Sequence, residues 1–533
     1  MPAHMQRYRE IAQVLARNGL YVTAQRAGLG RWLPPLANGA VDPRGEADIV
    51  PPMIVQTLRE LGTTFVKFGQ ALSMRHDILP DSWCTALGEL TDSEPPIDVS
   101  EVERAIRDDL GAGVEELYAT FDPQPLATAS IGQAHAATLP DGRAVVVKVR
   151  KPGVVEEVNE DLEILANLSG QLARSMTFFA DIDLPGMVAE FSRSLRTEMD
   201  YSAEARACQD FGAFFAGDAR IHVPWIDWDR SSTRVLTLER LSGIRIDDVA
   251  ALDAAGVDRQ ALALRCADML LRMVFEMGRF HADPHSGNLF VEPDGTIGVI
   301  DFGMIGRMTP LMARQFVAII VGMTRNDSSA VADALTTLAP PRGRLDRAAL
   351  RADVRGLLAR LEDKRLSDVS VVDVAGRLFT IVRDHRLALP PDVVLLLRML
   401  AIVDGLGRRI DPDFRLADAF GPFTERMLPE HLADRLATAA RDVTSLGAEL
   451  PGYLRRIADR LDGEGVDVHI RADGAVDRLV AGMIVAALIS GGSRVLVANQ
   501  QRLGPWSGPI LTAGAGLLGV IGGRLLRPRK RRV

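Results

Sequence analysis

The stretch from Phe280 to Gly303, FHADPHSGNLFVEPDGTIGVIDFG, constrains the fold of this chain more than any other feature. Its two short apolar runs are typical of strands, and the Asp-Gly pair between them supplies the positive φ angles of a tight hairpin turn. Such a hairpin brings Asp283, Asn288 and Asp301 to one end of a small sheet. This set suits metal-assisted phosphoryl transfer, with Asn288 and Asp301 as Mg²⁺ ligands and Asp283 facing the attacking oxygen. The alternative is a polar hairpin with two incidental acids, but the H-x-D-x-x-x-x-N spacing followed by DFG favours the site.

A lysine stands inside a second apolar segment. Residues 144–149, AVVVKV, are mostly β-branched and predict a strand that contains Lys148. An ammonium group in such a strand is costly unless it is paired, so Lys148 either points outward from an edge strand or meets phosphate and a carboxylate. Residues 126–135, LATASIGQAH, precede it and predict a strand, a tight loop and a strand, which favours the second interpretation.

The carboxylate partner is expected on a helix. Residues 184–208 carry a helical pattern that includes Glu198, Asp200 and Glu204, and the last two are four residues apart and share a face. Glu198 is the natural partner for Lys148 by this interpretation. The alternative is that all three acids face solvent.

A hinge is expected after the next apolar strand. Residues 235–239, VLTLE, predict that strand, and Arg-Leu-Ser-Gly follows it. The backbone around Glu239 and Leu241 is therefore where the adenine of a nucleotide would form hydrogen bonds.

The second half of the chain is largely helical by pattern. Residues 261–280 predict one long helix that leads into the catalytic loop, and Thr309-Pro310 predicts the start of the next helix. Only residues 304–308 separate DFG from that start, where a protein kinase needs a long activation segment that ends in A-P-E. His285 also stands where many serine/threonine kinases have lysine. Both features weaken a claim of protein phosphorylation.

Two uncharged apolar runs lie near the C-terminus, at residues 479–490 and 505–523, and a strongly basic tail follows them. A membrane-spanning helix needs roughly 20 residues, and the positive-inside rule would keep the basic tail in the cytoplasm. A two-span hairpin would leave the catalytic lobes on the cytoplasmic face of the cell membrane. The alternative is a soluble apolar helical pair that docks on the lobes.

Composition excludes some classes of protein. The net charge of −8 argues against a nucleic-acid binder. Three scattered cysteines without a C-x-x-C motif predict a reducing compartment and no structural zinc. The N-terminal residues MPAHMQRYRE lack the apolar core of a signal peptide.

Two further motifs bring in a resemblance. Residues 53–97 are apolar at helical spacing and contain Lys67 and Gln70 within FVKFGQALSMRHDILP, where spacing alone favours a solvated helical face. The sequence from Lys67 to Gln70 nevertheless looks like the K-x-G-Q motif of the UbiB family of protein-kinase-like ATPases, the atypical kinases of quinone biosynthesis. From about residue 50 to the C-terminus, the chain resembles that family, in which this helix covers the place where a protein substrate would lie.

The resemblance assigns roles to individual residues. Ala127, Thr128, Ala129 and Ser130 look like the alanine-rich loop that replaces the kinase glycine-rich loop and would contact the nucleotide. Lys148 falls on the nucleotide lysine and Glu198 on its partner within the E-x-D motif. Lys67 and Gln70 join Asp283 and Lys148 as catalytic candidates, and Asn288 and Asp301 fall on the two Mg²⁺ ligands. The implied cofactors are ATP and Mg²⁺.

These interpretations predict an α+β chain with a two-lobed protein-kinase-like fold, an N-terminal helical extension and a C-terminal apolar helical pair. The expected divisions are an N-terminal extension at 1–97, an N-lobe with inserted helices at 98–242, a C-lobe at 243–423, a helical linker at 424–476, and membrane-anchoring helices with a basic tail at 477–533.

The function that follows is a membrane-associated kinase-like ATPase that supports isoprenoid-quinone or related lipid metabolism. Its expected partners are the membrane surface, a membrane lipid or quinone intermediate, and other quinone-biosynthesis enzymes, with no nucleic acid. A small-molecule phosphotransferase of the aminoglycoside or choline kinase type is the first alternative, since it also lacks A-P-E. A non-catalytic nucleotide-gated scaffold is the second, although a chain that keeps Lys148, Asp283, Asn288 and Asp301 is unlike most pseudokinases.

Overall fold

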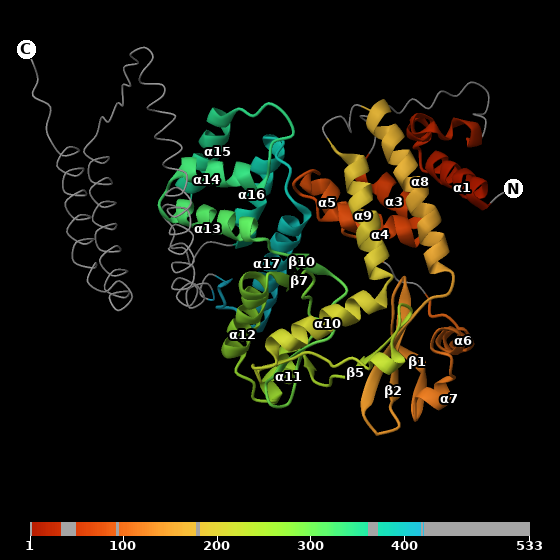
Figure 1. Ribbon diagram of the computed structural model, residues 1–533. Coiled ribbons are helices and arrows are strands. Elements are labelled where there is room, and N and C mark those ends of the chain that lie inside the picture. Colours follow the sequence, from red (N-terminus) through yellow and green to blue (C-terminus); the bar gives the residue numbers. More distant parts are fainter. Residues whose placement is uncertain are drawn as a thin grey trace, which may run out of the picture. The chain divides into compact units, whose positions relative to one another are not determined.

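The computed structural model describes residues 3–33, 50–91, 95–176, 182–360, 371–416 and 419 (Figure 1). They form an N-terminal helical region, a small lobe on an antiparallel sheet and a larger, mostly helical lobe. The expected α+β content and the helical N-terminal region are therefore confirmed. The expected linker and both apolar runs near the C-terminus lie outside the described residues. Within the described ranges, no helix is long and apolar enough to cross a membrane.

The N-terminal helices pack on a helical pair inserted in the small lobe. The helices are α1 (Ala3–Arg17), α2 (Tyr21–Ala24), α3 (Pro51–Leu61), α4 (Thr63–Ser73) and α5 (Asp81–Leu87), and the inserted pair is α8 (Val154–Ser175) and α9 (Leu184–Glu198). One hydrophobic core joins them, with Phe68 and Leu195 among its buried residues. The apolar pattern of residues 53–72 belongs to two helices, because Gly62 has a φ of 94° and separates α3 from α4.

The small lobe is an antiparallel sheet in the order β1-β2-β3-β5. The strands are β1 (Thr120–Thr128), β2 (Gly132–Thr138), β3 (Ala144–Arg150) and β5 (Val235–Glu239), as the sequence predicted. Lys148 pairs with Ala134 on one side and Leu236 on the other, so it lies on a central strand and not on an edge. Alternate β3 residues face opposite ways, and the valines at 145, 147 and 149 pack beneath α6 (Val99–Leu110) and α7 (Val114–Leu117).

The other face of this sheet is covered by α10 (Tyr201–Phe215). Tyr201 and Ala205 of α10 pack with Leu236 and Leu238 of β5, and Val146 of β3 lies against them. Lys148 is two residues from Val146 and therefore projects to the α10 face. The partner of Lys148 must therefore come from α10, because α10 covers the face of the sheet to which Lys148 projects.

The larger lobe holds the hairpin in a second sheet with the order β4-β9-β8-β6. Its strands are β4 (Ile221–His222), β6 (Ile244–Arg245), β8 (Leu289–Val291) and β9 (Ile297–Val299), and a separate pair is β7 (Arg279–His281) with β10 (Ile305–Arg307). Its helices are α11 (Val249–Ala254), α12 (Arg259–Arg272), α13 (Pro310–Thr324), α14 (Ser328–Leu338), α15 (Arg347–Ala359), α16 (Val371–Asp384) and α17 (Pro391–Ile410). Buried residues of α12, α17 and the hairpin share one core.

Residues 261–280 do not form the single long helix that their apolar pattern predicted. The helix α12 ends at Arg272, a π-helical turn follows to Met277, and Gly278 adopts a φ of 71°. Because Gly278 turns the chain out of the helix, the next residues form β7 and pair with β10. This reversal brings the catalytic loop beside the segment that follows DFG.

Candidate active site

Lys148 lies at the centre of the site, between two carboxylates. Its Nζ is 2.5 Å from Glu204 Oε1 on α10 and 3.6 Å from Asp301 Oδ2 at the end of the hairpin. Burial alone would lower the pKa of Lys148, but the charges of Asp301 and Glu204 outweigh it and raise that pKa above its ordinary value. Lys148 in turn lowers the pKa of Asp301. The ammonium therefore stays charged and is positioned to meet phosphate oxygens.

The candidate catalytic loop is held by the His281 side chain and by backbone hydrogen bonds. The Asp283 amide donates to His281 Nδ1 at 3.1 Å, and burial lowers the pKa of His281 to about 4, so the imidazole is a neutral acceptor. The Asn288 carbonyl accepts from the amide of Ile300 at 3.1 Å, which ties the loop to the segment that joins β9 to Asp301. The hairpin thus brings Asp283, Asn288 and Asp301 into one site, as the sequence predicted.

The donor set at this end of the hairpin fits a magnesium ion. Asn288 Nδ2 donates to the Asp283 carbonyl at 3.2 Å, which uses the nitrogen side of the amide and leaves its oxygen for a cation. Asp301 Oδ1 accepts from the Gly303 amide at 2.8 Å, and the side chain is 41% exposed. A carboxylate and an amide oxygen are ligands that Mg²⁺ accepts beside phosphate oxygens. Asn288 and Asp301 would hold the ion.

Asp283 is bound by an arginine that the sequence analysis missed. Arg398 of α17 places Nη2 3.0 Å from Asp283 Oδ1. The Nη1 of the same guanidinium is 2.7 Å from Met74 Sδ, at the end of α4. One arginine thus joins Asp283, the candidate catalytic acid, to the helix that carries the K-x-G-Q motif. A single arginine within the apolar stretch VVLLLRMLAIV was the signal for it, since an isolated charge there needs a partner.

The predicted pairing of Glu198 with Lys148 is wrong. Glu198 Oε1 lies 2.7 Å from Lys67 Nζ, while Glu204 pairs with Lys148. The reason is a break between α9 and α10 at Met199, where Asp200 caps α10 by accepting from the Ser202 amide. Glu198 and Glu204 therefore belong to different helices.

Gln70 and Gly69 position α4 within the N-terminal region. Gln70 Nε2 donates to the carbonyl of Leu90 at 3.1 Å. A Cβ on Gly69 would lie 2.3 Å from Leu90 Cδ1 and 2.8 Å from Leu58 Cδ1, so a larger residue would displace both leucine side chains. Two residues of the motif are thus used in packing, and Lys67 points to Glu198.

The alanine-rich loop and the hinge lie at the ends of the small-lobe strands. Ala127 and Thr128 end β1, the exposed Ala129 donates its amide to the Gly132 carbonyl at 2.8 Å, and Ser130 is buried. At the hinge, Glu239 ends β5, and its Oε2 accepts from His222 Nε2 at 3.0 Å. Leu241 lies against the hairpin, 3.0 Å from where a Cβ on Gly298 would stand. Their predicted nucleotide contacts stay predictions.

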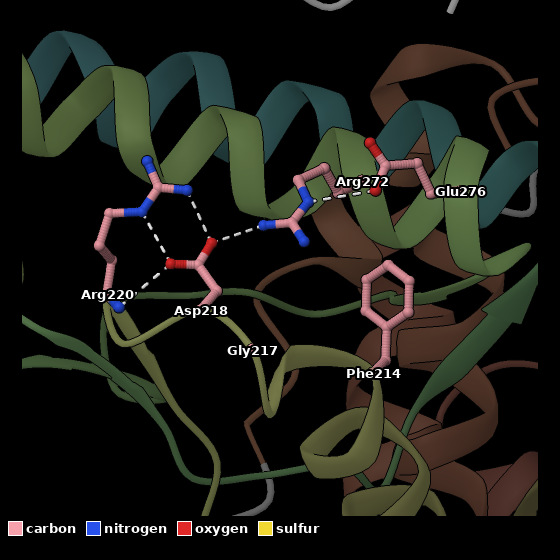
Figure 2. A pocket seen from close by; sticks show the side chains of 6 residues that line it. All are labelled: Phe214, Gly217, Asp218, Arg220, Arg272 and Glu276. Carbon is pink, nitrogen blue, oxygen red and sulfur yellow. Dashed lines mark hydrogen bonds and ion pairs between the residues drawn. The ribbon is translucent and has the colours of Figure 1, made fainter. Parts of the chain in front are cut away.

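A separate hollow of about 520 Å³ lies away from these residues, beside the start of β4 (Figure 2). Asp218 accepts from Arg220 at 2.6 Å and from Arg272 at 2.6 Å, and these arginines hold the pKa of Asp218 well below its ordinary value. Arg272 also pairs with Glu276 and lies over two phenylalanine rings. The charges of this hollow are compensated among themselves, which indicates a structural ion-pair cluster.

Two family models match this chain. Residues 89–335 match the model of the ABC1 atypical kinase-like domain, and residues 354–415 match that of the UbiB helical domain. A solved structure, the complex of Rv3197 with erythromycin from Mycobacterium tuberculosis, aligns with a TM-score of 0.45 at 24% identity, over 64% of this chain and 87% of that one.

Curated relatives extend the match to most of the chain. A probable protein kinase UbiB of Marinobacter nauticus is 35% identical over 405 residues, which cover 75% of this chain and 73% of that protein. One of Xylella fastidiosa is 32% identical over 524 residues and 93% of both chains. An uncharacterized protein of Synechocystis, sll1770, is 32% identical over 439 residues, or 81% of this chain and 75% of that one. The chain therefore belongs to the UbiB family of proteins with an ABC1 atypical kinase-like domain.

Proposed function

We propose that this protein is a membrane-associated ATPase with a kinase-like fold that supports isoprenoid-quinone or related lipid metabolism. The observation that carries the proposal is the cluster of Lys148, Glu204 and Asp301 beside Asp283 and Asn288. It has the cation, the acids and the amide that phosphoryl transfer from Mg-ATP requires. Family membership supports the use of ATP as the phosphoryl donor, since two relatives are named probable protein kinases.

The residues have distinct roles in this proposal. Lys148, kept charged by Glu204 and Asp301, orients the phosphates. Asn288 and Asp301 would hold Mg²⁺, which would neutralise the charge of the phosphates. When the γ-phosphorus accepts an oxygen from water, its bond to the β–γ bridging oxygen breaks, and the water proton passes to the Asp283 carboxylate. A lipid hydroxyl is the alternative acceptor and would give up its proton in the same way.

The hydrogen bond from Arg398 to Asp283 supports an enzyme whose activity is held back until Asp283 is released. The guanidinium of Arg398 occupies Oδ1 of Asp283, one of the two oxygens that could accept the proton. Arg398 also contacts Met74 of α4. A lipid partner that shifts α4 would therefore loosen Arg398 and free Asp283 for the reaction.

The first test follows the γ-phosphate. Purified protein and radiolabelled ATP are incubated with membrane extract, and the label is recovered from inorganic phosphate, lipid and protein. Asp301→Asn should abolish both the release of label and the thermal shift given by Mg-ATP, because the main metal ligand loses its charge. Asp294→Asn is the matched control, since Asp294 lies in the turn of the same hairpin and caps Thr296. A wild-type thermal shift in Asp301→Asn would refute the metal-ligand assignment.

The second test concerns the proposed anchor and the cytoplasmic membrane face. A chain that ends before Leu479 lacks both apolar runs and the basic tail. We expect it in the soluble fraction with its response to Mg-ATP unchanged, and the full chain in the membrane fraction. Full-length protein that is soluble without detergent would contradict membrane association. The full chain is then purified in detergent, and the molecules that remain bound to it are identified. We expect lipid intermediates and quinone-biosynthesis enzymes among them.

A further inference from the structure

The outer face of α13 is more apolar than a solvent-facing helix should be. Nine large apolar side chains are exposed among the described residues, and four of them lie on α13: Leu311 (46%), Val317 (43%), Ile320 (37%) and Val321 (37%). Single exposed apolar residues are ordinary, but several on one helix mark an interaction surface. The α13 face therefore needs a partner.

The outer face of α13 is separate from the face that packs in the hydrophobic core. The opposite side of α13 is already buried, with Ile319 in the core shared with α14 and Phe316 packed against it. At Gly322 a Cβ would come within 2.7 Å of Val331 Cγ2, so the two helices approach closely. Val317, Ile320 and Val321 are three and four residues apart and therefore share an outward side of the helix. The helix thus has one apolar side for the core and a second one that faces out.

The charges around this face indicate what covers it. Arg314 lies within the exposed stripe, and the exposed Arg307 and Arg325 stand at its two ends. From Phe302 to Asn326 the sequence contains no acidic residue. An apolar stripe flanked by arginines suits the boundary between headgroups and acyl chains of a bilayer that contains anionic lipid.

A second copy of the chain fits this face less well. A two-fold symmetric contact would place the same three arginines opposite one another without an acid on the helix to offset them. Four exposed side chains are also far fewer than the 20 to 30 residues a side of a stable interface, which buries about 800 Å² per partner. The chain's own C-terminal tail is basic as well and would repel these arginines.

We propose that the outer face of α13 lies against a bilayer with anionic lipid and positions the catalytic lobe on it. This inference rests on the membrane association proposed above. The proposed bilayer contact lies close to DFG in the sequence, because only residues 304–309 separate Gly303 from α13. Within that segment, β10 pairs with β7, which ends at His281 of the catalytic loop. The bilayer contact is thus joined directly to the loop of Asp283, where a lipid acceptor would react.

Fluorescence quenching in the full chain tests this surface. All three native cysteines are buried, and burial raises the pKa of each thiol to about 12, so a new surface cysteine can be labelled selectively. Val317→Cys and Leu264→Cys receive a bimane label, and Leu264 on α12 is the control at 37% exposure. Vesicles of phosphatidylcholine and phosphatidylglycerol carry brominated acyl chains. We expect a loss of fluorescence at position 317 and none at position 264.

Flotation of the same samples separates this inference from membrane association. A chain that floats with vesicles but shows no quenching at position 317, or equal quenching at 264, overturns the α13 surface and leaves membrane association standing. A chain that does not float overturns both. The label at 317 could also be shielded before vesicles are added and then not be quenched by them. That result would show that protein covers the face, and it also overturns the proposal. Ile320→Cys repeats the measurement, and Arg314→Glu should reduce quenching at 317 in anionic vesicles.

Discussion

Two lysine–glutamate pairs differ in how deeply they are buried. In the candidate nucleotide site, the side chains of Lys148 and Glu204 are 20% and 11% exposed, and Asp301 adds a second carboxylate. In the N-terminal region, Lys67 Nζ lies 2.7 Å from Glu198 Oε1, and the Lys67 side chain is 14% exposed but that of Glu198 is 40% exposed. Removing one member of a buried pair typically costs about 3–5 kcal/mol, and an exposed pair contributes about 1 kcal/mol or less. The first pair therefore holds the site together, and the second can open at low cost.

The largest difference between the two pairs should come from their lysines. Lys148→Met removes the cation that faces the phosphates and leaves two acids close together, so we expect ATP hydrolysis to fall on the order of 100-fold. Lys67→Met should keep hydrolysis within a few-fold, because Lys67 pairs with Glu198 outside the Lys148 cluster. Single-turnover hydrolysis and the Mg-ATP thermal shift measure both. Equal losses in the two variants would mean that Lys67 takes part in the chemistry.

A smaller contrast is expected between the glutamates. A charge-assisted hydrogen bond contributes about 1.5–3 kcal/mol, so Glu204→Gln should weaken nucleotide binding by roughly 10- to 100-fold. Glu198→Gln alters the exposed pair with Lys67 and should leave nucleotide affinity almost unchanged. Equilibrium titration with a fluorescent ATP analogue and Mg²⁺ compares them. If Glu198→Gln has the larger effect, the pairing seen here is not the one that operates with nucleotide bound.

Arg398 should have an intermediate effect with the opposite sign. An ion pair of ~1 kcal/mol corresponds to about fivefold in rate, so Arg398→Gln should raise basal ATP hydrolysis by about that factor by freeing Asp283. Arg383→Gln is the matched control, since Arg383 donates to the carbonyls of His76 and Leu79 and contacts the same N-terminal region. Steady-state hydrolysis without membrane extract gives the comparison. A fall in the Arg398 variant would identify this arginine as a phosphate ligand.

The smallest effect concerns pH at the hinge. His222 donates to Glu239 at 3.0 Å and to Glu292 at 2.7 Å, and Asp294 also faces it. Burial lowers the pKa of His222, but Glu292 and Glu239 outweigh it, so the net pKa is raised. Stabilisation by protonated His222 is therefore complete below its unfolded pKa of about 6.5 and is lost as the pH rises through its folded pKa.

Urea unfolding between mildly acidic and mildly alkaline pH should show this loss in wild type. His222→Gln should make the free energy of unfolding less dependent on pH in that window. Ionic strength is kept constant because the group is partly exposed and is screened by salt. A His222→Gln variant with the wild-type pH profile would assign the dependence to other groups.

The sequence by itself determined the elements whose residues interact within a short stretch. The hairpin with Asp283, Asn288 and Asp301 closes within 24 residues, and its turn chemistry and strand pattern are local. The same holds for β3 and its lysine, for β5, and for the Thr309 cap of α13, whose side chain accepts from the Met312 amide. Local hydrogen bonds and alternation of apolar residues are enough to specify such elements.

Only the tertiary structure decided which charged groups meet. Glu198 and Glu204 both suit a lysine, and the choice depended on the helix break at Met199 and on which face of the sheet α10 covers. Arg398 reaches Asp283 from 115 residues away, a distance in sequence at which no local pattern operates. The physical reason is that an ion pair depends on the positions of two side chains in space, whereas a turn or a strand depends on the backbone preferences of neighbouring residues.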